Sequence, residues 1–220
     1  MNKTKIEWTD YSWNPITGCE HGCWYCYANK LFTRFHRSFK PTFHNERILE
    51  PWKLTKPSKI FCCSVSDLFA PWTPIMWRDA VIGSIEQCPI PHTFQLLTKN
   101  PERIPNLEFP ENVWVGTTVT GEGDDWKNIE AMRSVRANRF VSFEPLIGDL
   151  DFSLHPLDEI DWVIVGKLTG SKKVKLKFSW LASVMDETAR VGIPLFMKNN
   201  LRQAFPNLRL LQQFPEGMEK

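Results

Sequence analysis

The stretch "SWLASVMDETARVGIPLFMK" (179–198) contains a helix pattern followed directly by a strand pattern. Its first part (179–192) has the apolar spacing of an amphipathic helix, with a Ser N-cap at the start and Gly192 at the end. Its last part (193–198) is a short apolar run, typical of a buried strand. Another such run, "DWVIVG" (161–166), comes before the helix. This order of strand, helix and strand predicts an α/β protein with parallel strands.

The same alternation extends toward the N-terminus. Short apolar runs predict further strands near 13–17 and at 59–65, 93–98, 113–119 and 139–146, and helical spacing recurs at 73–88 and 124–135. About seven strands result, with no break in composition, so we expect one domain over residues 1–220. A full or partial (β/α) barrel and an open doubly wound sheet both fit this pattern. In either fold, working residues gather at the carboxyl ends of the strands.

The composition is that of a soluble globular protein, with 42% hydrophobic and 24% charged residues among 220. With a net charge of only +2, the chain as a whole has no strong positive electrostatic potential that would attract nucleic acids. No apolar run approaches the roughly 20 residues that span a bilayer, so we expect no membrane association. The first residues lack the apolar core of a secretory signal. We therefore expect a cytoplasmic protein with reduced thiols.

Three cysteines lie close together in "TGCEHGCWYCYANK" (17–30), namely Cys19, Cys23 and Cys26. A thiol–disulfide enzyme would use the last two as a C-x-x-C pair and leave Cys19 without a role. A purely structural role fits poorly, because the intervening residues are mostly polar. An iron–sulfur cluster held by three thiolates would leave one iron open for another ligand.

A structural zinc site is a further interpretation, and it requires a fourth ligand. His21 lies between the first two cysteines, which is cramped for closing a tetrahedron. Cys62 or Cys63 could supply the ligand from the next strand. Since these two are adjacent in a predicted strand, we expect their side chains to point to opposite faces and to serve as core thiols.

The segment "CEHGCWYC" (19–26) resembles the Cys-x3-Cys-x-aromatic-Cys signature of the radical S-adenosylmethionine (SAM) superfamily. Other blocks resemble a phage- and prokaryote-associated three-cysteine-motif family of unknown function within it, which is distantly similar to spore photoproduct lyase. The resemblance extends over residues 5–198. The blocks are "KIEWTDYSWNPITGC", "SVSDLF", "QLLTKNPER", "VWVGTTV", "RFVSFEPLIG", "DWVIVG" and "GIPLFMK".

The resemblance implies a full or partial (β/α) barrel with the cysteine loop after the first strand. It also implies a 4Fe–4S cluster on Cys19, Cys23 and Cys26, with SAM bound to the fourth iron. Reductive cleavage of SAM would give a 5′-deoxyadenosyl radical for hydrogen abstraction. Tyr25 would lie against the adenine, and Asp67 would accept the SAM amino group. The cofactor-binding set is completed by Ser64, Ser66 and Thr117.

Three further polar residues fall at strand ends and are the expected catalytic set: Lys99, Glu144 and Lys198. Glu144 is expected to contact SAM or substrate. The alternative is a structural ion pair between Glu144 and one of the two lysines. The loop "GKLTG" (166–170) and the basic run after it differ from the Gly-Gly-Glu-Ser-Gly-like segment of the family. Substrate contacts at this loop are therefore not carried over.

The substrate is expected to be a nucleic acid or nucleotide, because "KLFTRFHRSFK" (30–40) combines basic and aromatic residues. Peptide or small-metabolite modification is the alternative reaction, and a non-enzymatic zinc-binding module is the alternative function. Radical chemistry would also require an electron donor such as flavodoxin or ferredoxin, and a partner protein is compatible with the family.

Overall fold

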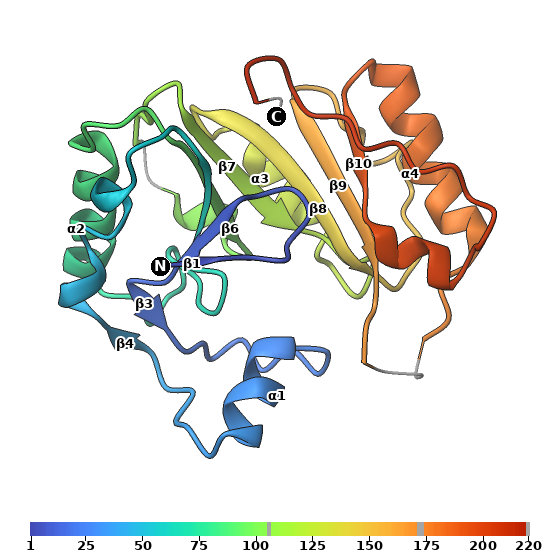
Figure 1. The fold of residues 1–220 in the computed structure, drawn as a ribbon. Helices are drawn as coiled ribbons and strands as arrows, with labels where there is room; N and C mark the ends of the chain where they lie inside the picture. Colours follow the sequence, from blue (N-terminus) through green and yellow to red (C-terminus); the bar gives the residue numbers. More distant parts are fainter. Residues whose placement is uncertain (105–106, 171–173, 219–220) are drawn as a thin grey trace.

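The computed structural model describes residues 1–104, 107–170 and 174–218. An eight-stranded sheet dominates it, in the order β1-β2-β5-β6-β7-β8-β9-β10 (Figure 1). Only the short β1 is antiparallel to its neighbour, and all the other pairs are parallel. The strands are β1 (Asn2–Lys3), β2 (Tyr11–Trp13), β5 (Lys59–Cys62), β6 (Thr93–Thr98), β7 (Val113–Thr118), β8 (Asn138–Leu146), β9 (Trp162–Lys167) and β10 (Leu195–Met197). The predicted α/β fold with parallel strands is confirmed.

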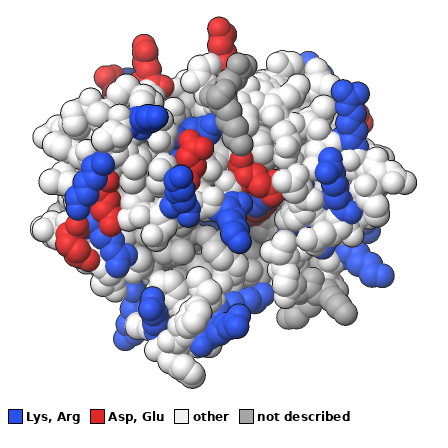
Figure 2. Space-filling view, in the orientation of Figure 1, with Lys and Arg blue, Asp and Glu red and all other residues white. Residues whose placement is uncertain are grey.

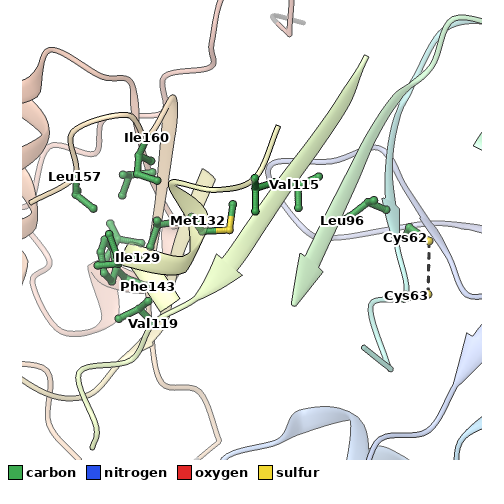
Figure 3. Close-up of a cluster of buried hydrophobic side chains, with 14 of the residues drawn as sticks. Cys62, Cys63, Leu96, Val115, Val119, Ile129, Met132, Phe143, Leu157 and Ile160 are labelled. Carbon is green, nitrogen blue, oxygen red and sulfur yellow. Dashed lines mark hydrogen bonds between the residues drawn. The ribbon is translucent and has the colours of Figure 1, made fainter. Parts of the chain in front are cut away.

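Three helices that connect strands of this sheet all pack on one of its faces. They are α2 (Ile75–Glu86), α3 (Lys127–Met132) and α4 (Phe178–Val191). Val81, Ile129 and Leu181 from these helices join one core with the strand residues Val115 and Val163. Figure 3 shows part of this core, with α3 side chains directed toward the sheet. Because a doubly wound sheet carries helices on both faces, this arrangement is a partial barrel.

The opposite, inner face is filled by aromatic side chains in the half nearer the amino ends of the strands. Trp162 lies at their centre, with ring centroids 5.8 Å from Phe140, 6.1 Å from Trp114 and 6.3 Å from Trp8. Gly116 makes room for this packing, since a Cβ there would lie 2.4 Å from the Phe140 ring. These aromatic residues, with Phe61, Phe196 and Met218, form an aromatic plug inside the partial barrel.

The predicted helix at 179–192 is confirmed, but its first turn is not as expected. The helix begins at Phe178, Lys177 is its N-cap, and no side chain caps it, so Ser179 is a helical residue. The predicted end is correct, because Gly192 has φ 78° and terminates the helix. None of the helices in the described ranges has the length and apolar character that a membrane span requires.

The chain between β2 and β5 holds elements that the sequence pattern did not predict. The expected strand near 13–17 divides into β2 and a short β3 (Ile16–Thr17), which pairs with β4 (Thr42–Phe43). Between them lies α1 (Tyr27–Arg34), which stands clear of the main sheet (Figure 1). Short 3-10 turns occur at Asn45–Arg47, Pro51–Lys53, Pro101–Arg103 and Asn199–Gln203.

Candidate active site

A cavity of about 580 Å³ opens at the carboxyl ends of the strands. Every site residue predicted from the sequence lines it, except Thr117. The aromatic plug closes the barrel beneath it, and the plug residues Trp8 and Phe61 form part of the lining. The lining residues of the predicted set are Cys19, Cys23, Tyr25, Cys26, Ser64, Ser66, Asp67, Lys99, Glu144 and Lys198.

The cysteine loop (18–26) is held at both of its ends. Gly18 has φ 87°, and a Cβ there would lie 2.2 Å from the carbonyl oxygen of Lys40, so a side chain cannot be accommodated. Its N–H donates to the carbonyl of Val65, just after β5, at 3.1 Å. At the other end, Cys26 is the N-cap of α1, and its Sγ accepts from the N–H of Asn29 at 3.3 Å. These contacts hold the loop in the position at which its three thiols face the cavity.

All six cysteines are free, and the three in the loop are half-buried. Burial raises the pKa of Cys19 to about 11, and the neighbouring Asp67 and loop thiols add to this. A metal must therefore displace a proton from Cys19 to bind it. In the part of the chain that the structure describes, there is no group of three or more His, Cys, Asp or Glu side chains that could hold a single metal ion.

Asp67 is buried, and its carboxylate is a hydrogen-bond centre at the end of β5. Its Oδ1 accepts from the Thr98 hydroxyl at 2.7 Å and from the Phe69 N–H at 3.0 Å. Its Oδ2 accepts from the Lys99 N–H at 3.0 Å and from the Asn100 side-chain amide at 2.9 Å. The acceptor positions are thus largely occupied by protein donors. A SAM amino group, as predicted from the resemblance, would have to displace one of them.

His21 connects the cysteine loop to this centre. Its Nε2 lies 2.8 Å from Asp67 Oδ2 and 3.3 Å from the Asn100 side-chain amide. Its ring and that of Trp72 are in edge-to-face contact, with centroids 4.8 Å apart. His21 is therefore engaged in holding the loop against the ends of β5 and β6.

The hydroxyls of Ser64 and Ser66 form hydrogen bonds with the segment that follows β2. Ser64 donates to the Asn14 side-chain oxygen at 3.1 Å, and Ser66 donates to the Ile16 carbonyl at 2.8 Å. Tyr27 of α1 also donates its hydroxyl to the Ser64 carbonyl at 2.6 Å. Both serines thus support the rim of the cavity, and their contact with SAM stays a prediction.

Thr117 lies outside the cavity, contrary to the prediction. Its side chain is fully buried, and its hydroxyl donates to the Thr98 carbonyl at 3.0 Å. The neighbouring Thr118 lines the cavity instead. Successive side chains of a strand point to opposite faces, so a shift of one residue reverses the assignment.

The three predicted catalytic residues occupy different parts of the cavity. Glu144 on β8 forms an ion pair with Lys198, which follows β10, so the predicted alternative of an ion pair is present. The pair crosses the inner face of β9 at Gly166, where a Cβ would lie 2.9 Å from Lys198 Cδ. Lys99 lies elsewhere, with Nζ 5.5 Å from the centroid of the Tyr25 ring. This is a cation–π distance.

Tyr25 lies within the cysteine loop and faces the cavity. Burial, together with the nearby Cys23, raises the pKa of its hydroxyl well above the usual value. The phenol therefore stays protonated at any physiological pH. Its ring meets Trp24 edge-on at 5.5 Å, and Lys99 lies over its face.

Cys62 and Cys63 do not point to opposite faces, contrary to the expectation. The strand ends at Cys62, and Cys63 has a left-handed backbone with φ 58°, which turns its side chain. Their sulfurs lie 3.6 Å apart, and a dashed line joins the two side chains in Figure 3. Both are buried in the helix-side core, as expected of core thiols, and Cys63 also lines the cavity. The alternation rule failed because the strand, predicted over 59–65, ends at Cys62, before Cys63.

Two polar groups of the cavity lining were missed by the sequence prediction. Ser142 Oγ and Trp8 Nε1 are buried, and neither has a hydrogen-bond partner within the described residues. Ser142 lies two residues before Glu144 on β8, and so on the same face, which is the signal that could have identified it. Buried polar groups without partners are rare, so both are available to a ligand or to water.

The sequence was compared with models of known protein families. Residues 3–204 match a family model whose description is "Protein of unknown function (DUF5131)". The chain belongs to this family. None of the curated proteins compared with this DUF5131 member matches it.

Solved structures of spore photoproduct lyase have a similar fold. A variant of that enzyme with one cysteine replaced by serine aligns with a TM-score of 0.58 at 12% sequence identity, covering 93% of this chain and 76% of the other. A doubly substituted variant "with bound AdoMet and dinucleoside spore photoproduct" aligns with a TM-score of 0.56 at 12% identity and the same coverage. At this identity the likeness shows the shared fold.

Proposed function

We propose that this DUF5131 protein is a radical SAM enzyme. The observation that carries the proposal is the position of three free thiols, Cys19, Cys23 and Cys26. They face one cavity at the carboxyl ends of a partial barrel. Catalytic groups of such folds gather at this end of the strands.

The donor set fits a 4Fe–4S cluster better than a single metal ion. Three thiolates bind three different irons of a cluster, so their sulfurs need not converge on one point, as those of a zinc site do. No convergent ligand group is present among the described residues. Together with SAM, a cluster held at this position would supply a 5′-deoxyadenosyl radical that abstracts hydrogen from a substrate.

The protein's own residues provide the surroundings for this chemistry. Cys19, Cys23 and Cys26 would hold the cluster on one wall of the cavity. The ion pair of Glu144 with Lys198 offers charged groups on β8 and after β10, where a substrate can be oriented. The aromatic plug closes the floor of the cavity, and this apolar packing would limit the access of water to the reacting groups from below.

A nucleic acid or nucleotide is the substrate class that we propose. Phe39 of the basic and aromatic segment 30–40 lines the cavity, and two solved structures of similar fold hold a dinucleoside spore photoproduct. Peptide or small-metabolite modification is the alternative. The electron needed for SAM cleavage would come from a small redox protein such as flavodoxin or ferredoxin.

Anaerobic purification with iron and sulfide reconstitution tests the proposal. We expect a brown protein with about four irons and four sulfides per chain, as a 4Fe–4S cluster requires. The Cys19→Ala, Cys23→Ala and Cys26→Ala variants should each lose most of this iron. Cys88→Ala is the matched control, because Cys88 lies outside the cavity lining, and it should keep the cluster. A colourless protein that retains one zinc after reconstitution would contradict the proposal.

A further inference from the structure

The segment 21–45 is basic in a chain that is otherwise slightly acidic. It contains Lys30, Arg34, Arg37 and Lys40 and no Asp or Glu. Since the whole chain carries a formal charge of +2, the residues outside this segment carry a net −2. In the ranges that the structure describes, none of these four cations forms an ion pair. Their charge is therefore available to a partner.

The same segment exposes large apolar side chains on and after α1. Tyr27, Leu31 and Phe35 are 57%, 45% and 58% exposed, and their spacing of four residues places them along one side of the helix. Ala28 is the buried residue of α1. Contiguous exposed apolar groups of this kind mark interaction sites.

This surface is continuous with the mouth of the cavity. Tyr27, Ala28 and Phe39 belong to both the segment and the cavity lining. Figure 1 shows α1 beyond the carboxyl ends of the strands, away from the sheet. Figure 2 shows Lys and Arg side chains, and no acidic ones, over this part of the face. A flexible chain lying on α1 would thus reach the cavity directly.

We propose that the segment 27–40 binds single-stranded nucleic acid. Phosphates would contact Lys30, Arg34 and Arg37, and bases would stack on the exposed rings of Tyr27 and Phe35. A cavity of about 580 Å³ admits one nucleotide-sized unit of such a strand, whereas a folded acidic protein cannot enter it. Delivery of that unit to the cavity rests on the proposed function, but binding to the segment does not.

Fluorescence anisotropy with a labelled 12-residue oligothymidine tests this surface. The protein is purified anaerobically and used without SAM at 50 mM salt, so binding is measured apart from any reaction. We expect log Kobs to fall with log salt with a slope of about −2 to −3, which corresponds to three or four phosphates. A duplex of the same length should bind more weakly.

Two variants separate the charged and stacking contributions. Lys30→Glu/Arg34→Glu/Arg37→Glu should weaken binding at least about 30-fold and flatten the salt slope. Tyr27→Ala/Phe35→Ala should weaken it at least about 30-fold, because two stacked bases are lost, and leave the slope unchanged. Circular dichroism and the thermal midpoint check that both variants remain folded.

The matched control reverses three other cations that are exposed and outside the cavity lining. These are Lys53, Lys56 and Arg209, each changed to Glu. This variant should bind like the unmodified protein. The inference is overturned if the oligonucleotide does not bind at 50 mM salt, or if both charge reversals weaken binding equally. It is also overturned if the segment instead binds an acidic redox protein. None of these results affects cluster assembly, so the proposed function is tested separately.

Discussion

At the scale of single residues, Asp67 and His21 determine where the cysteine loop lies. Asp67 accepts hydrogen bonds from the backbone and side chains at the ends of β5 and β6, and His21 reaches it from the loop. The carboxylate therefore connects three segments that are distant in sequence. We regard Asp67 as a positioning residue, because its acceptor positions are occupied by the protein.

Asp67→Ala should destabilise the fold and the cysteine loop together. Buried donors that lose an acceptor cost roughly 1–3 kcal/mol each, so we expect the free energy of unfolding to fall by about 3 kcal/mol. Urea unfolding measures this change. Iron content after reconstitution should also fall, since the loop loses its anchor at His21.

Asp79→Ala is the control for this prediction. Asp79 is an exposed carboxylate on α2 that pairs with its neighbour Arg78, so its loss should change stability by less than about 0.5 kcal/mol. If Asp67→Ala retained both the stability and the iron content of the unmodified protein, Asp67 would not have the role described.

Residue types at the site were predictable, but their partners and orientations were not. The three cysteines, Tyr25 and Glu144 follow from motif spacing and from strand ends, and all of them line the cavity. Thr117 was assigned to the cavity incorrectly, because adjacent residues of a strand point to opposite faces of the sheet and an error of one position reverses the face. The partners of Asp67 lie more than 30 positions away in sequence for most of its bonds, so local sequence gave no sign of them.

At the scale of elements, α4 shows how a predicted helix is fixed in place. Glu187 on α4 is buried, and its carboxylate accepts from the Leu157 N–H at 2.9 Å and from Arg190 Nε at 2.7 Å. The hydrogen bonds from Arg190 are the main cause that lowers the pKa of Glu187. This group joins the helix to the loop between β8 and β9.

The lowered pKa gives a pH-dependent contribution to stability. The contribution is complete above the unfolded-state pKa of Glu187, near 4.5, and is lost as the pH falls through the lower folded-state value. Glu187→Gln should therefore reduce the free energy of unfolding by about 1–3 kcal/mol at pH 7. The difference from the unmodified protein should shrink below about pH 4.5.

Urea unfolding measures the effect. It is carried out at several pH values between roughly 3.5 and 7, which lie below and above the unfolded-state pKa of Glu187. Glu86→Gln, at the exposed end of α2, is the control and should show no such dependence. A stability difference for Glu187→Gln that stays constant over the whole range would contradict the role assigned to its charge.

The long elements were predictable from periodicity, whereas short ones were not. The six strands β5 to β10 and the helices α2 and α4 appear within a few residues of their predicted places. In contrast, α1 has eight residues and buries only Ala28, so it has no apolar stripe facing a core. Its exposed rings and basic residues instead form the surface proposed to bind nucleic acid.

At the scale of the whole molecule, the partial barrel separates structural from functional regions. Helices cover the outer face, and the aromatic plug fills the inner face near the amino ends of the strands. The cavity remains at the carboxyl ends, bordered by the cysteine loop and the ion pair of Glu144 with Lys198. Periodicity alone did not distinguish a barrel from a doubly wound sheet, because both use the same strand and helix patterns.

Reductive cleavage of SAM is the reaction that tests the central claim most directly. The reconstituted protein is incubated anaerobically with dithionite and SAM, and 5′-deoxyadenosine is quantified by chromatography. We predict its formation by the unmodified protein and by Cys88→Ala, and its loss in Cys19→Ala, which removes one thiol of the cysteine loop. No 5′-deoxyadenosine from protein that holds a full iron complement, or equal amounts from Cys19→Ala, would contradict the account.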